Sequence, residues 1–227
     1  MTGLLVLGAA GWVGVLAWSH GMDNGPGPMG FGVVEFVAFW VVMMAAMMLP
    51  IVTTAGTRPA GLAATIVFAA GYLAVWTAVG VAFYLASLGT QRLAEHHHDT
   101  AVATGIAIFC LCAVYQCSAW KLRALRSCSA IQFPAITTIG AGAQYALRCL
   151  VTSIAMMLLF LALGFMQVAA MLVIALALFV ERRTGARTVS VVLGAIALAY
   201  AIAIAVHPAL APGLDAAPVM SDAGDGM

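Results

Sequence analysis

Residues 40–50 read W-V-V-M-M-A-A-M-M-L-P, an apolar stretch with four methionines that ends at a proline. At about 100° per residue, a helix places these methionines on two adjacent stripes, with one turn between the members of each pair: Met43 with Met47, and Met44 with Met48. Pro50 has no backbone N–H, so we expect the last turn to open or kink. The stretch predicts an apolar helix with a broad face of thioether sulfur.

This methionine face has two interpretations. A thioether is a soft, neutral ligand that suits Cu(I) far better than Mg²⁺ or Ca²⁺, and it binds without losing a proton. Methionine is also an ordinary filler of gaps between packed helices, and a stripe at helical spacing is more often packing than ligation. The stretch alone leaves both interpretations open.

The composition around this stretch is that of a polytopic membrane protein. Of the 227 residues, 64% are hydrophobic and 7% are charged, which excludes a soluble domain with a charged surface. A span needs roughly 20 apolar residues, so the chain has room for about six or seven. The net charge of +1 gives no sign of nucleic-acid binding. The expected partners are the lipid bilayer and possible membrane-protein subunits.

The apolar runs predict an all-α transmembrane bundle of about seven spans, with six as the alternative, at residues 4–18, 33–52, 62–88, 101–120, 145–180 (two spans) and 189–206. We interpret residues 145–180 as a helical hairpin with a tight turn at Gly164–Phe165, because a hairpin places nearly all basic residues on one side. That side is then cytoplasmic and holds the N-terminus. No basic residue precedes the first run, so we keep it as a span rather than a signal peptide.

Residues 1–207 are expected to form one domain in the inner (plasma) membrane. Residues 208–227 are rich in Ala, Gly, Pro and Asp, a composition typical of a disordered tail, here extracytoplasmic. The histidines fall on the same outer side, where His96–His98 could capture Cu²⁺ or Zn²⁺. A solvated loop is the alternative for this triplet.

The cysteines follow no zinc-site spacing. Cys110 and Cys112 point about 200° apart on a helix, so they cannot chelate one ion as a pair. A cysteine site must therefore take ligands from another helix. A rise of ~1.5 Å per residue places Cys117 and Cys149 at the depth of the inner methionines. Further outward, three more sulfur atoms continue the series: Met156, Met166 and Met171.

The charged residues give little support for catalysis. Lys121, Arg123 and Arg126 form a basic segment that we expect to contact anionic lipid at the membrane surface. Glu35 is a candidate proton carrier or ligand near the outer boundary of its span. The sequence has no nucleophile elbow, P-loop or paired intramembrane carboxylate, so we expect no enzymatic activity.

Three separated segments carry a family resemblance: the M-x-x-A-M-M-x-P core within residues 40–50, then Tyr115-Gln116 with Lys121 and Cys128, then Tyr145, Cys149, Gly164, Met166, Met171 and Glu181. Together they resemble a bacterial family of predicted metal-binding integral membrane proteins, a domain of unknown function. Several family cysteines are replaced here, by Ala124, Ala146 and Leu150. The resemblance implies metal binding, and the surviving methionines favour copper(I) over zinc, which is the alternative metal.

The sequence therefore predicts an integral membrane protein that handles copper(I) by binding, transfer or transport. The candidate metal ligands are the methionine and cysteine sulfur atoms of the predicted spans: Met43, Met44, Met47, Met48, Cys117, Cys149, Met156, Met166 and Met171. The alternative is a non-catalytic accessory or scaffold subunit of a membrane complex, with methionines and small residues that pack against partner helices.

Overall fold

The computed structural model describes residues 2–19, 31–53, 61–129, 138–165 and 167–214. These residues form helices and no strand, so the predicted all-α class is confirmed. The α-helices are α1 (Thr2–Ser19), α2 (Val33–Val52), α3 (Leu62–His96), α4 (His98–Cys117), α5 (Ala119–Ser129), α6 (Ile139–Leu163), α7 (Val168–Thr184) and α8 (Arg187–Val206). Two short 3₁₀ turns follow them, η2 (Pro208–Leu210) and η3 (Pro212–Leu214).

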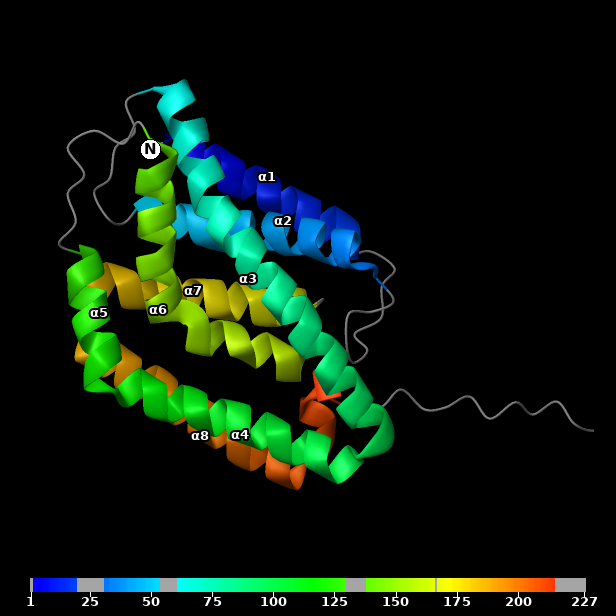
Figure 1. Ribbon diagram of the computed structural model, residues 1–227. Coiled ribbons are helices and arrows are strands. Elements are labelled where there is room, and N and C mark those ends of the chain that lie inside the picture. The colour runs from blue at the N-terminus through cyan, green and yellow to red at the C-terminus, as the bar shows by residue number, and fades with distance from the viewer. Residues whose placement is uncertain (1, 20–30, 54–60, 130–137, 166, 215–227) are drawn as a thin grey trace, which may run out of the picture.

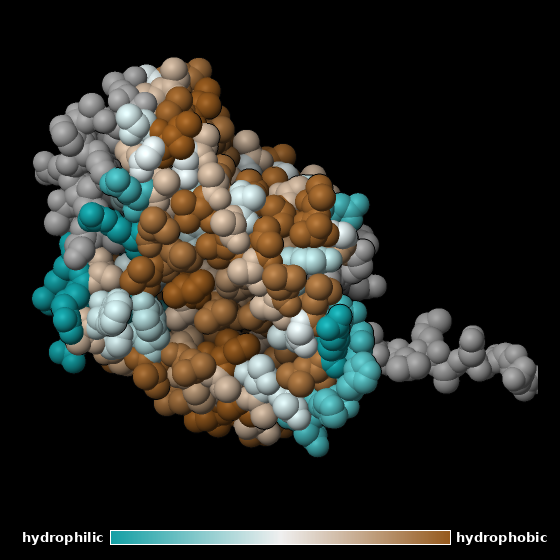
Figure 2. All heavy atoms as spheres, in the orientation of Figure 1, coloured by the Kyte–Doolittle hydropathy of each residue, from teal (hydrophilic) through white to brown (hydrophobic). Residues whose placement is uncertain are grey.

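The surface of the bundle suits a lipid environment. Six helices are long and apolar enough to cross a membrane: α1, α2, α3, α4, α6 and α8. α7 has 17 residues, slightly fewer than the roughly 20 that a span needs. Figure 2 shows hydrophobic residues across the middle of the molecule and hydrophilic residues at opposite ends, near α5 and near the α3–α4 junction. This is the distribution expected for an apolar slab with water on both sides.

α6 and α7 form the hairpin that the basic residues predicted. α6 ends at Leu163, and α7 begins at Val168 after a short turn. Gly164 in this turn has a φ of +86°, a conformation that glycine adopts without steric cost. The predicted turn at Gly164–Phe165 is therefore confirmed.

α6 lies at the centre of the fold. It packs against α3 on one side and against α4 on the other, while α4 and α8 lie side by side along the edge opposite α1 and α2 (Figure 1). The contact between α3 and α6 is backbone to backbone. A Cβ added at Gly142 would lie 2.1 Å from the Phe68 carbonyl oxygen, and one at Gly71 would lie 2.1 Å from the Ile139 oxygen.

α2 is held between α1, α3 and α7. It continues past Pro50 to Val52, so the proline lies inside the helix. A Cβ added at Gly8 of α1 would lie 2.7 Å from Pro50 Cγ, and one at Gly11 would lie 2.7 Å from the Ala46 nitrogen. The small residues of α1 thus allow α2 to pack closely against this helix.

The ordered bundle extends further than the composition suggested. Residues 208–214, which we assigned to a disordered tail, form η2 and η3, and Ala211 and Leu214 are buried. A Cβ at Gly105 of α4 would lie 2.8 Å from Leu214 Cδ1. This glycine leaves an apolar slot for the leucine, which explains the order. Residues 215–227 lie outside the described residues.

Candidate metal centre

The four methionines of α2 are fully inside the bundle, none more than 1% exposed. α2 contacts α3 through Trp40, whose indole nitrogen donates a hydrogen bond to the Trp76 carbonyl oxygen at 2.8 Å. Met47 lines a cavity of about 120 Å³ with residues of α1 and α7. Met47 therefore faces α1 and α7.

α7 brings another candidate ligand to the α2 side. Ala175 of α7 lines the cavity together with Met47, and Met171, one turn before Ala175, is fully buried. Met166 lies outside the described residues. The structure therefore places Met171 on the helix that faces Met47.

Cys149 is held between α3 and α6. Its side chain is buried, and the Tyr72 hydroxyl donates a hydrogen bond to Cys149 Sγ at 3.2 Å. The Tyr72 ring in turn contacts the rings of Phe68, Trp76 and Tyr145. The thiol is thus fixed in an aromatic layer of the core.

Cys117 is placed differently from the other candidates. It is exposed and lines a groove with Cys110 and Gly194 between α4 and α8. α4 and α8 form the edge of the bundle away from α1 and α2 (Figure 1). The structure thus places Cys117 beside α8, whereas the α2 methionines lie among α1, α3 and α7. The equal depth of these residues stays a prediction.

Sequence reasoning missed Cys112 as a candidate, although it included Met156. Cys112 Sγ of α4 donates a hydrogen bond to Met156 Sδ of α6 at 3.8 Å, and both residues are buried. The expectation that a cysteine site needs a ligand from another helix therefore applies to Cys112. Only the packing of α4 on α6 could identify this partner.

Gln116 lies one turn after Cys112 and is fully buried. Within the described residues, neither its amide oxygen nor its amide nitrogen has a hydrogen-bond partner. Each buried polar group left in this state costs about 1–3 kcal/mol. The family resemblance includes Gln116 in its Tyr-Gln motif, but the amino-acid pattern alone indicates no role for this residue.

Lys121 corrects the expectation of a lipid-facing basic segment. Its side chain is buried, and Nζ donates hydrogen bonds to Glu181 Oε1 and Oε2 at 2.7 and 2.8 Å. Ser190 Oγ donates to Glu181 Oε1 at 2.6 Å. Burial lowers the pKa of the Lys121 ammonium, and the Glu181 carboxylate opposes this shift. We call these residues the polar clamp, because they join α5, α7 and α8.

The histidine triplet lies at the junction of α3 and α4, and His96 Nδ1 is 3.0 Å from the Arg92 carbonyl oxygen of its own helix. Across the part of the chain that the structure describes, no three His, Cys, Asp or Glu side chains are grouped to hold a metal ion. The sulfur clusters described above contain too few such residues to form a group of this kind. Thioethers, which suit Cu(I), are the main soft donors among them.

Comparison with known proteins agrees with this chemistry. The sequence model of the PpoB2 family, which is described as a copper chaperone, matches residues 37–204. Neither the curated proteins nor the solved structures contain a match. The matched range covers most of the chain and includes the α2 methionines, Cys149 and the Cys112–Met156 pair. The chain therefore belongs to the PpoB2 copper chaperone family.

Proposed function

We propose that the protein is a carrier of Cu(I) in the inner (plasma) membrane and that it holds the ion as cargo on buried methionine and cysteine sulfur. One observation carries this proposal: a chain of a copper chaperone family buries four thioethers of one helix in the interior of its bundle. The carrier passes copper on without chemical conversion, so it acts as a chaperone rather than an enzyme.

The ligands of this carrier are the α2 methionines, supplemented by sulfur from the helices around them. Met47 faces α7, on which Met171 is buried. Cys149 of α6 is oriented by the Tyr72 hydroxyl of α3, and α3 also packs against α2. A cargo ion on α2 therefore has soft donors on either side.

The chemistry of these donors favours copper over zinc. A structural zinc ion usually takes four thiolate, imidazole or carboxylate ligands, whereas thioether sulfur suits Cu(I). Neutral thioethers also carry no charge into the low-dielectric interior, so the buried empty site needs no counterion. The methionine ligands can release the ion to a partner without taking up a proton.

The test is the metal content of the purified protein in mild detergent under reducing conditions, after loading with Cu(I). The parent is compared with a variant in which Met43, Met44, Met47 and Met48 are all leucine. Leucine conserves the volume and burial of methionine, so the variant should fold. Met157→Leu is the matched control, because Met157 is fully buried on α6 but is not a proposed ligand.

We expect the parent and the Met157→Leu control to retain copper and the fourfold variant to lose at least one equivalent per chain. A parent that binds no copper would overturn the proposed function. A fourfold variant that keeps all of its copper would remove the α2 methionines from the ligand set.

A further inference from the structure

The contact between α4 and α6 places two sulfur atoms in the geometry of a metal site. Cys112 Sγ and Met156 Sδ are 3.8 Å apart. Both can therefore lie at the usual metal–sulfur distance of about 2.3 Å from one ion, with an angle at the metal of about 110°. Cys112 is 1% exposed and Met156 5%, so water does not compete for the ion.

Gln116 supplies a second, independent observation at the same place. It lies one turn after Cys112, and side chains of a helix tilt toward its N-terminus, which here is toward Cys112. Its amide is fully buried, and within the described residues both polar atoms have no hydrogen-bond partner. On the α8 side, a Cβ at Gly194 would lie 3.3 Å from Gln116 Cβ. Gln116 thus lies on the same face of α4 as Cys112, with the α8 backbone close to its Cβ.

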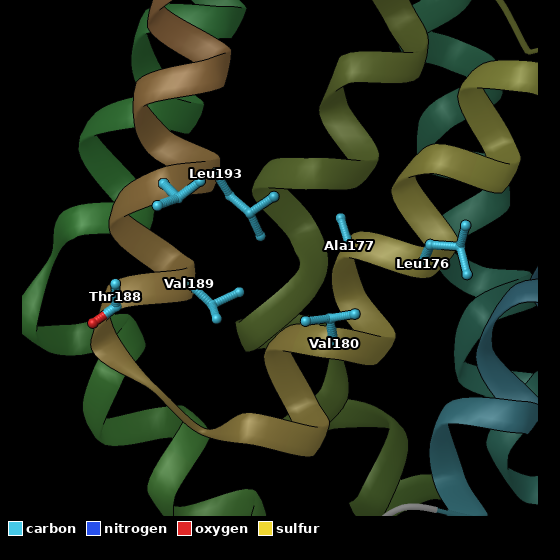
Figure 3. Close-up of a pocket in the computed structure, with 7 residues that line it drawn as sticks. Leu176, Ala177, Val180, Thr188, Val189 and Leu193 are labelled. Atoms are coloured by element: carbon cyan, nitrogen blue, oxygen red, sulfur yellow. The ribbon is translucent and has the colours of Figure 1, made fainter.

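A cavity borders the pair on the Met156 side. It has a volume of about 300 Å³, lies between α4, α6, α7 and α8, and includes Met156 in its lining. Ala177 and Leu193 line both this cavity and a neighbouring cleft of about 390 Å³ between α7 and α8. Figure 3 shows Val189 and Leu193 of α8 extending toward the α7 side of the cleft, where Val180 lies. Of the two sulfur atoms, that of Met156 therefore borders the cavity.

We propose that Cys112 and Met156 form a second Cu(I) site, separate from the α2 methionines, with Gln116 as its positioning residue. This inference rests on the proposed function, because it takes Cu(I) as the cargo. On binding, the Cys112 S–H bond breaks, a sulfur–copper bond forms, and the proton is released to bulk water. The oxidation state of copper does not change.

The charges of this site balance when it is loaded. The thiolate carries one negative charge and Cu(I) one positive charge, while Met156 is neutral, so no net charge is buried. The Gln116 amide nitrogen donates a hydrogen bond to the thiolate sulfur, as groups around a metal ligand commonly do. This hydrogen bond gives the amide nitrogen a partner.

The second site is distinct from the first because its ligands belong to other helices. Cys112 and Met156 lie on α4 and α6, whereas α2 packs against α1, α3 and α7. The two sites can therefore be removed one at a time. Copper binding at the site on α4 and α6 should also depend on pH, because the Cys112 thiol releases a proton on binding.

The experiment measures bound copper per chain and copper X-ray absorption for Cys112→Ser and Met156→Leu, beside the parent and the fourfold leucine variant of α2. Cys110→Ser and Met157→Leu are the matched controls, since Cys110 lies on the same helix but faces the α8 groove. We expect each site variant to lose about one equivalent of copper, and the controls to lose none. Gln116→Leu should keep the stoichiometry and weaken the affinity roughly tenfold.

The possible outcomes distinguish the proposed function from the proposed second site. A parent without copper overturns the proposed function and this site with it. If the fourfold variant loses copper while Cys112→Ser and Met156→Leu keep the parent's stoichiometry, affinity and sulfur coordination, the second site alone is overturned. If Cys112→Ser does not fold, the volume-conserving Met156→Leu variant decides the question.

Discussion

The methionine stripe of α2 and the Cys112–Met156 pair both bury sulfur in the bundle, but the chain builds them in different ways. The stripe comes from eleven consecutive residues of one helix, so its spacing is written in the sequence. The pair joins residues that are 44 positions apart. α2 alone supplies several thioether sulfur atoms, whereas α4 and α6 each supply one sulfur atom to a single contact.

The surroundings of the two regions differ as well. Around α2, aromatic rings and glycine contacts fix the helices by shape. On the α4–α8 side, the polar clamp of Lys121, Glu181 and Ser190 fixes α5, α7 and α8 by charge and hydrogen bonds. A region held by close packing should lose stability when a side chain is enlarged. A region held by an ion pair should lose stability when one member of the pair is removed.

The largest effect is expected from Lys121→Met, which removes one partner of the polar clamp. The Glu181 carboxylate then remains buried without its ammonium, and breaking such a pair costs about 3–5 kcal/mol. Thermal unfolding in detergent measures the loss. Arg126→Ala on the exposed side of α5 should change stability by no more than about 0.5 kcal/mol.

The double variant Lys121→Met/Glu181→Met should recover much of this loss, because it leaves no charge in the core. Copper binding on α2 should survive in the double variant. A single variant as stable as the parent would show that charge does not hold this side together.

An intermediate effect is expected from Gly142→Ala, which tests the close contact of α6 with α3, the helix that also packs against α2. The new Cβ would meet the Phe68 carbonyl oxygen at 2.1 Å, so α3 and α6 must separate, at a cost of about 1–3 kcal/mol. Gly140→Ala is the matched control on the same turn of α6, because its Cβ would meet nothing within 4 Å. This control should be neutral or stabilising by up to about 1 kcal/mol. Equal stability of the two variants would contradict the close contact.

The smallest effect is expected from Tyr72→Phe, which removes the hydrogen bond to Cys149 Sγ and leaves the ring in place. A hydrogen bond of this kind contributes about 0.5–1.5 kcal/mol, and the freed thiol should also hold copper less tightly. Tyr84→Phe is the control, since the Tyr84 hydroxyl makes no hydrogen bond within the described residues and its ring packs on Phe36. If the unfolding curves of Tyr72→Phe and the parent coincide, the hydrogen bond from the Tyr72 hydroxyl to Cys149 does not contribute to stability.

Much of the architecture could be read from the sequence, because helix length and apolar runs are local properties. The second span was predicted at residues 33–52, and α2 spans Val33–Val52. The hairpin of α6 and α7 followed from the positions of basic residues around a run too long for one helix. The end of the bundle was missed, because the burial of Leu214 depends on Gly105 more than 100 positions away.

The sequence by itself determined the helical class, the α2 methionine stripe and the shortage of charge, since each depends on residues close together in the chain. Only the tertiary structure decided which donors meet. Lys121 and Glu181 are 60 positions apart, and Cys112 shares its helix with Cys117, yet one thiol faces α6 and the other the α8 groove. Helix packing selects one rotation of each helix from many that satisfy the same apolar pattern, and that rotation decides which side chains come into contact.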